Sequence, residues 1–209
     1  MTPARTRVLA AAQAAVGLTG DDYRALVAAP ELEAGDVVRA NEIATMSGCE
    51  RTWRAIVDTA LGIPGQLYTT GDGFGDLYRV AGGSPWKPGG AVRLARLDSQ
   101  PQVGDAIIYG ASASAVAHVD ACVVAAELRG TVLLVSVIAG GQRDAAGGET
   151  VKLLTRTLRW QRTHWEDVAN GRPVLAVCDP DLLAAHVGWS DPDAAPDTQP
   201  SGAAAVDAE

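Results

Sequence analysis

Residues 46–64 read MSGCERTWRAIVDTALGIP, and this stretch carries the clearest structural signal in the chain. Ser47 and Glu50 stand three positions apart, the spacing of a capping box at the start of a helix. Gly62 and Pro64 follow where such a helix would end. Between them, apolar residues recur with the helical period at Trp53, Ile56, Val57, Ala60 and Leu61. The stretch therefore predicts a helix over residues 49–61 with one buried face.

Cys49 begins that face, in the first turn of the predicted helix. The free N–H groups and the positive dipole end of a helix N-terminus favour a thiolate and lower a cysteine pKa from about 8.5. Free cysteines are also among the most buried residues and pack as small hydrophobes. Taken alone, this helix makes Cys49 either a core residue or a nucleophile, and a nucleophile needs a base.

The composition indicates an ordinary globular chain. It has 209 residues, 47% hydrophobic and 20% charged, which suits one domain with tails or two small ones. The net charge is −8 and the pI about 4.8, which disfavours duplex DNA or an anionic membrane as a partner, because both need a basic surface. Three cysteines without a CxxC pair and only three histidines predict no disulfide framework, no metal site and no cofactor.

The predicted elements change character along the chain. Helices are expected over residues 5–17, 21–29 and 49–61, and a short one near 75–81 in a Gly-rich stretch, 65–100. Strands are expected over 106–110, 118–128, 131–140, 149–160 and 173–179, with turn residues between them. Helices followed by an antiparallel meander indicate an α+β fold. We expect an N-terminal helical segment (1–40), a main domain (41–189) and a disordered tail (190–209).

A candidate base opens one of these strands, in AHVDACVV. Strand alternation places His118, Asp120 and Cys122 on one face, and Val119, Ala121 and Val123 on the other. His118 could accept the Cys49 proton if its strand lies beside the helix N-terminus, or it could be a histidine of purely structural role. His164, in a polar loop, and His186, near the tail, are poorer candidates.

Candidates for a third group, which would orient the imidazole, follow the next strand in SVIAGGQRD. Gln142 and Asp144 are the polar residues just beyond a double glycine, and either could take the orienting role of a Cys–His–X site. The alternative interpretation is a solvated turn.

The order of these motifs resembles the papain-like fold. A cysteine at a helix start, a strand introduced by PQVGDAIIY and a histidine in AHVDACVV are most similar to the bacterial NlpC-type and CHAP amidases and peptidases. The resemblance covers about residues 42–160. It implies Cys49 as nucleophile, His118 as general base and a residue of GGQRD as orienter. Gln142 is the first choice for that role, with Asp120 and Asp144 as alternatives.

The resemblance also implies a substrate, an amide of a peptidoglycan peptide cleaved through a thioester. Tyr68 and Trp86, in the Gly-rich segment, are candidates for lining the binding groove. One departure stands beside the nucleophile: NlpC-type enzymes usually carry Asp before the cysteine, whereas this chain has Gly48. Two other functions stay open, a catalytically inactive papain-like binding module and an acyltransferase that passes the thioester to an amine or alcohol.

The expected compartment stays open as well. A wall hydrolase must leave the cytoplasm, but the N-terminal run, MTPARTRVLAAAQAAVGLTG, predicts an amphipathic helix rather than a signal peptide. No apolar run is long enough for a transmembrane helix. A cytoplasmic location, a dedicated secretion machine and phage-mediated release are each compatible with the sequence.

Overall fold

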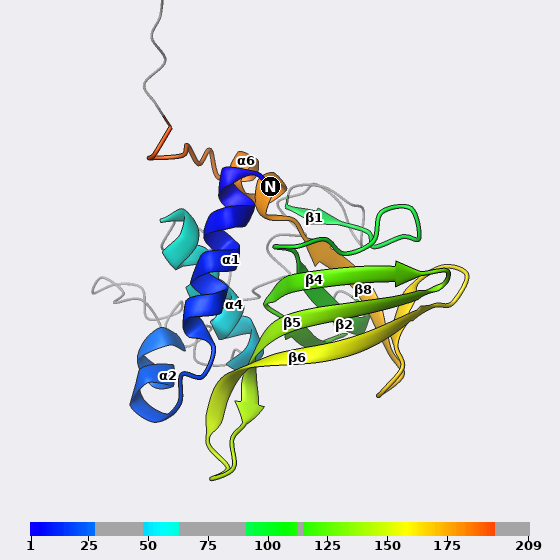
Figure 1. Ribbon diagram of the computed structural model, residues 1–209, viewed down its shortest axis with the longest axis horizontal. Helices are drawn as coiled ribbons and strands as arrows, with labels where there is room; N and C mark the ends of the chain where they lie inside the picture. The colour runs from blue at the N-terminus through cyan, green and yellow to red at the C-terminus, as the bar shows by residue number, and fades with distance from the viewer. Residues whose placement is uncertain (28–47, 63–90, 113–114, 195–209) are drawn as a thin grey trace, which may run out of the picture.

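The computed structural model describes residues 1–27, 48–62, 91–112 and 115–194. Helices gather on one side and strands on the other (Figure 1). The helices are α1 (Pro3–Ala15), α2 (Gly20–Val27), α4 (Gly48–Leu61) and α6 (Pro180–His186). The strands are β1 (Val92–Arg93), β2 (Ala106–Ser112), β3 (Ala115–Asp120), β4 (Cys122–Arg129), β5 (Val132–Arg143), β6 (Glu149–Trp160), β7 (Trp165–Asp167) and β8 (Arg172–Cys178). The α+β class and the antiparallel sheet are thus confirmed.

The sheet is an antiparallel meander that nearly closes on itself. Strands β4 to β8 pair in sequence order, and β8 then pairs with β2, which pairs with β3. The chain runs directly from β3 into β4, so the two ends of the sheet are joined by covalent continuity at Ala121. The backbone N–H of Ala121 donates to the carbonyl of Ile138 on β5, at 2.8 Å. This near-closure brings strands from opposite sides of the sheet towards a common interior.

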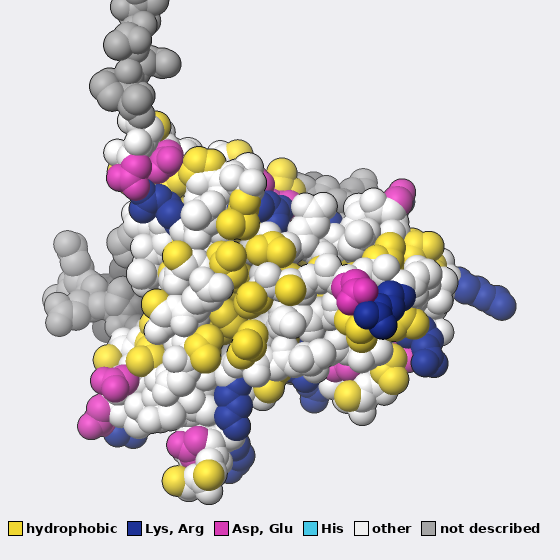
Figure 2. All heavy atoms as spheres, in the orientation of Figure 1, with side chains coloured by type: hydrophobic (Ala, Val, Ile, Leu, Met, Phe, Trp, Pro, Cys, Tyr) yellow, Lys and Arg dark blue, Asp and Glu magenta, His cyan; other side chains and the backbone are white. Residues whose placement is uncertain are grey.

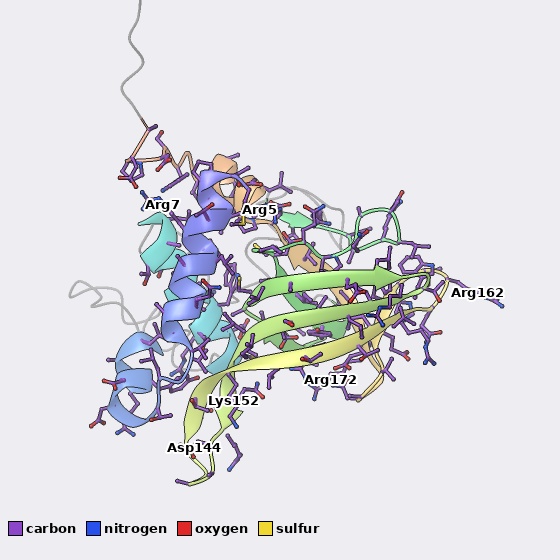
Figure 3. All side chains as sticks on the ribbon, in the orientation of Figure 1. Arg5, Arg7, Asp144, Lys152, Arg162 and Arg172 are labelled. Carbon is purple, nitrogen blue, oxygen red and sulfur yellow. The ribbon has the colours of Figure 1, made fainter. Side chains whose placement is uncertain are left out.

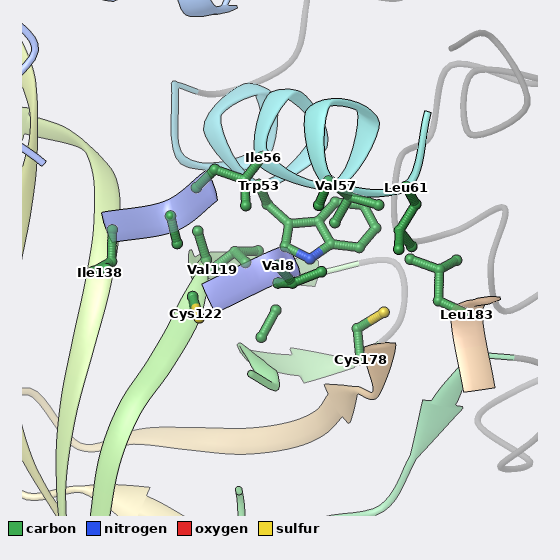
Figure 4. Close-up of a cluster of buried hydrophobic side chains, with 14 of the residues drawn as sticks. Val8, Trp53, Ile56, Val57, Leu61, Val119, Cys122, Ile138, Cys178 and Leu183 are labelled. Carbon is green, nitrogen blue, oxygen red and sulfur yellow. The ribbon is translucent and has the colours of Figure 1, made fainter. Parts of the chain in front are cut away.

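Two hydrophobic clusters follow from this wrapping. The first fills the interior of the sheet with the inward side chains of β2, β4, β5, β6, β7 and β8, including Tyr109, Leu133, Leu158 and Trp165. The second lies between the helices and the outer face of the sheet, and Figure 4 shows Trp53 of α4 in its middle, near Val8 of α1. The predicted buried face of residues 49–61 is confirmed, since all five of its apolar residues are buried.

An ionic cluster fixes α1 to the strand layer. Figure 3 shows Arg5 where α1 approaches α6 and β1. Its guanidinium pairs with Asp105 (2.8 Å), Asp179 (2.6 Å) and Asp181 (2.8 Å). Arg93 of β1 also pairs with Asp105 and Asp179. Burial raises the pKa of Asp105 to about 6, although both arginines act in the opposite direction.

Several predicted boundaries differ from the structure. The strand expected over 118–128 is two strands, because the chain leaves β2 and joins β5 at Ala121. The alternation therefore slips: Cys122 lies with Val119 in the helix-facing cluster, not on the face of His118 and Asp120 as predicted. β1, β7 and α6 were not predicted, and each is seven residues or fewer.

Some predictions fall where the structure gives no description. The helix near 75–81 lies outside the described residues, as do 195–209 of the predicted tail. In the described ranges, no helix is long and apolar enough to cross a membrane. On the face drawn in Figure 2, Lys and Arg side chains lie singly or in small groups among acidic and apolar ones.

Candidate active site

The candidate nucleophile lies at the start of α4. The helix begins at Gly48, so Cys49 is its second residue, and its relative exposure is 8%. Glu50 is in the first turn, while Ser47, the predicted N-cap, lies outside the described residues. The buried face of α4 continues from Cys49 into the cluster around Trp53. The thiol is therefore attached to a helix whose position is set by core packing.

The double glycine of β5 allows the strand to pass very close to this helix. A Cβ on Gly140 would lie 1.8 Å from Oγ1 of Thr52, and one on Gly141 would lie 3.0 Å from the backbone N of Cys49. Gly141 also has φ = +67°, a conformation that favours glycine. The register of β5 against β6 shifts between Ala139 and Gln142. The glycines thus serve close packing against the helix start.

Gly48 is also fixed by its surroundings. A Cβ at this position would lie 2.8 Å from the hydroxyl of Tyr23 and 2.9 Å from Oε2 of Glu149. The Tyr23 hydroxyl donates to the Gly48 carbonyl at 3.2 Å and accepts from the N–H of Gly141 at 3.0 Å. These groups occupy the space of a side chain, which gives a physical reason for glycine before the cysteine.

His118 of β3 lies beside the cysteine. Its ring makes a hydrogen bond with the Cys49 side chain, and its Nε2 lies 3.0 Å from Oδ1 of Asp120. Burial lowers the pKa of His118, but the hydrogen bonds and charges of Asp120 and Cys49 outweigh burial and raise it to about 9. An imidazolium facing a thiolate and a carboxylate would have a pKa displaced in this direction. The start of α4 and the second half of β3 are therefore brought together, and His118 does not open its strand as predicted.

Asp120, the partner of the imidazole, is completely buried. Besides His118, its carboxylate accepts two hydrogen bonds from Arg156 of β6, at 3.0 and 3.1 Å. It accepts a fourth from the hydroxyl of Tyr109 on β2, at 2.8 Å. Burial raises the pKa of Asp120, but the hydrogen bonds from His118 and Arg156 lower it below its ordinary value.

The other two candidates for the third role have different partners. The amide nitrogen of Gln142 donates to the carbonyl of Gly140 at 3.1 Å. Asp144 lies in the β5–β6 turn, labelled in Figure 3, and accepts from the N–H groups of Ala146 (2.9 Å) and Gly148 (2.8 Å). The structure therefore joins Asp120, the alternative from the same strand, to His118, and uses Asp144 in its own turn.

The remaining histidines lie elsewhere. His164 bonds the hydroxyl of its neighbour Thr163 at 3.2 Å and borders a separate hollow of about 710 Å³ that Trp160 and Arg162 also line. His186 is the last residue of α6. Tyr68 and Trp86, predicted to line the groove, lie outside the described residues.

The other two cysteines lie within the core. Figure 4 shows Cys122 and Cys178 among apolar side chains. Burial raises the pKa of Cys122 to about 12 and that of Cys178 well above its ordinary value, and the charge of Asp105 adds to both. All three cysteines are free. Among them, Cys49 is the one joined to an imidazole.

Comparisons with known proteins give no match. No family model fits the chain, and neither the curated proteins nor the solved structures contain a match to it. Across the described ranges, no group of three or more His, Cys, Asp or Glu residues is placed to hold a metal ion. The site must therefore be interpreted from its own geometry.

Sequence reasoning missed Arg156 and Tyr109. Tyr109 pairs directly with His118 across β2 and β3, and their rings stack with centroids 6.0 Å apart. Strand alternation in AIIYG could have placed Tyr109 on the inner face. Arg156 gave a weaker signal, a charged residue at an inward position of ETVKLLTRTLRW between Leu154 and Leu158.

Proposed function

We propose that this protein is a cysteine hydrolase of papain-like type that cleaves an amide bond through a thioester. The observation that carries the proposal is the convergence of Cys49, His118 and Asp120 at the start of α4. The nucleophile and the base come from segments about 70 residues apart. A nucleophile, a base bonded to it and a carboxylate orienting that base are the parts that nucleophilic acyl transfer requires.

In the proposed mechanism, each partner of the imidazole uses a different ring nitrogen. Nε2 faces the ionised carboxylate of Asp120, so this nitrogen carries a proton and donates it in a hydrogen bond. The other ring nitrogen, Nδ1, is then the atom that exchanges a proton with the Cys49 thiol. Asp120 keeps the ring in this orientation and stabilises the imidazolium.

The proposed reaction has two stages. The Cys49 thiolate attacks the carbonyl carbon, forming a C–S bond while the carbonyl oxygen becomes an oxyanion. The backbone N–H of Cys49, at the positive end of the α4 dipole, is a donor to that oxyanion. Collapse breaks the C–N bond, and the His118 imidazolium gives its Nδ1 proton to the leaving amine. Water, deprotonated by His118, then attacks the thioester and releases a carboxylic acid and the thiol.

The proposed substrate is an amide in a peptidoglycan peptide, and it rests on the resemblance of the Cys49, GD-strand and His118 motifs to NlpC-type and CHAP enzymes. The geometry of Cys49 and His118 supports the reaction type, and the substrate follows from the family likeness. The two parts can therefore be tested separately.

The test compares Cys49→Ala with Cys178→Ala on purified peptidoglycan. Released amines are measured, and far-UV circular dichroism checks the fold of each variant. We expect Cys49→Ala to reduce release to background, and Cys178→Ala, which removes a buried thiol influenced by Asp105 and Asp179, to retain activity if it folds. Equal activity of Cys49→Ala and wild type would refute the mechanism. An intact, reactive Cys49 without any release from peptidoglycan would refute the substrate alone.

A further inference from the structure

Asp120 has more partners than an orienting carboxylate needs. One hydrogen bond is enough to orient a histidine, yet this carboxylate accepts four. They come from His118, from Tyr109, and from Nε and Nη2 of Arg156. An ionised carboxylate offers about four acceptor positions, so its capacity is filled. Arg156 and Asp120 form a bidentate guanidinium–carboxylate pair, which fixes the plane of the carboxylate and favours its ionised form.

The position of Arg156 also brings a positive charge to the imidazole. Its terminal nitrogen lies 3.4 Å from Nε2 of His118, while the same nitrogen donates to Oδ1 of Asp120 at 3.0 Å. Nε2 already directs its proton at Asp120, so the contact with Arg156 is one between two cationic groups when His118 is protonated. A like charge at this distance disfavours the protonated imidazole.

This opposition has a chemical use in the proposed reaction, on which the inference rests. The buried Asp120 carboxylate and the Cys49 thiolate both favour the protonated form of His118. The proposed reaction nevertheless requires this proton to pass to the leaving amine. A general acid works best with a pKa near the working pH. The positive charge of Arg156 would limit the proton affinity of His118 and so keep the imidazolium able to donate its proton.

We propose that Arg156 and Tyr109 are positioning residues of the site, in which Arg156 locks the Asp120 carboxylate and limits the proton affinity of His118. Tyr109 contributes a neutral donor to the same carboxylate and stacks on the imidazole. Asp120 raises the proton affinity of His118, and the positive charge of Arg156 limits that increase.

Charged and titratable groups face His118 from four of the described elements. Cys49 faces it from α4, Asp120 from its own strand, Tyr109 from β2 and Arg156 from β6. Asp167 of β7 acts on Arg156 and Tyr109 through its charge and is itself almost fully buried. Arg156 is the cation of this set when His118 is neutral.

The test measures the pKa of His118 directly, by NMR titration of its ring in the full-length protein. The His118→Asn variant assigns its signal among the three histidines. Arg156→Met removes the charge and keeps the stem, Arg156→Lys keeps the charge and loses the fork, and Tyr109→Phe removes one donor. We expect Arg156→Met to raise the pKa of His118 by about 1 pH unit or more. Tyr109→Phe should raise it less, and Arg156→Lys should leave it near the wild-type value.

Hydrolysis by the same variants gives a second measurement. The alkaline limb of kcat/KM should move upward in Arg156→Met together with the pKa of His118, and kcat should fall. An unchanged or lowered pKa in Arg156→Met would overturn the proposal and leave Arg156 a structural residue. If that variant does not fold, Arg156→Gln, which also removes the charge but keeps a polar side chain, decides in the same way. Because the titration needs no turnover, a wild type without activity would refute the proposed function and leave this test intact.

Discussion

Asp120→Asn is the sharpest test of the site, because it changes one charge without changing shape. Asp120 and Cys49 together raise the pKa of His118 from 6.5 to about 9, against the effect of burial. This difference of about 2.5 pH units corresponds to about 3 kcal/mol of interaction that favours the imidazolium. With Asp120 neutralised, burial should lower the pKa of His118 from about 9, because Cys49 is then the remaining partner among its main causes that raises it. The imidazolium facing Cys49 would then be lost at a lower pH than in the wild type.

The assay is the rate of alkylation of Cys49 by iodoacetamide between pH 5.5 and 9, followed by peptide mapping. An opposite charge in hydrogen-bond contact changes an ionisation equilibrium by about 1–3 pH units, so alkylation at pH 6.5–7 should slow about tenfold or more in Asp120→Asn. The variant also leaves Arg156 without its counter-charge, at a cost of about 3–5 kcal/mol in unfolding free energy, so folding is checked by circular dichroism.

Gln142→Ala is the matched control, because the Gln142 amide is bonded to the Gly140 carbonyl rather than to the imidazole. It should alkylate at the wild-type rate across the pH range. A folded Asp120→Asn protein with an unchanged profile, or a slowed Gln142→Ala, would refute the assignment of Asp120. Cys122 and Cys178 should stay unmodified until the protein unfolds, since burial raises the pKa of both thiols.

Two further predictions concern the close packing at Cys49 and the proton balance of the site. Gly130→Ala and Gly141→Ala both place a side chain at positive φ, which lowers the free energy of unfolding by about 1–2 kcal/mol. Gly141→Ala should lower it further and slow alkylation of Cys49, because its Cβ would lie 3.0 Å from the Cys49 nitrogen. A Cβ at Gly130 would have nothing within 4 Å. Equal costs in denaturant unfolding would contradict this. In Cys49→Ala no thiol titrates beside His118, and Asp120 still strengthens proton binding in the folded state. The free energy of unfolding should therefore fall as pH rises above about 6.5 and through the pKa of folded His118. A flat or rising curve would contradict a raised His118 pKa in this variant.

The elements that could be predicted are those whose signal is local. The helical period over 49–61 predicted α4 within one residue, and the strand predicted over 149–160 matches β6. α6 has a clear start in Asp179-Pro180, where the Asp179 side chain accepts from the N–H of Asp181, but seven residues are too few for a helical period to be visible. β7 has three residues and depends on its neighbours β6 and β8 for its pairing.

The residues of the site likewise differ in how far local sequence could predict them. Cys49 lies in the first turn of α4, as the local sequence predicted, whereas His118 is the fourth residue of β3 and not the first residue of a strand, as predicted. Asp120 shares a strand face with His118. Choosing Asp120 over Gln142 required the path of β5, because the bulge at the double glycine decides where Gln142 points. Arg156 required the whole sheet: β3 and β6 are not neighbours in the strand order, and only the wrapping of the sheet brings Arg156 to Asp120.

The three cysteines show why burial alone could not distinguish a core cysteine from a candidate nucleophile. All are free and all are buried, so the bland interpretation of Cys49 as a core residue agrees with its 8% exposure. What differs is the charge that faces each sulfur. Cys122 and Cys178 feel the carboxylate of Asp105, which disfavours a thiolate, whereas Cys49 contacts an imidazole whose proton Asp120 retains. The core therefore supplies the rigid position of Cys49, and the wrapped sheet supplies the charge that would make its thiol reactive.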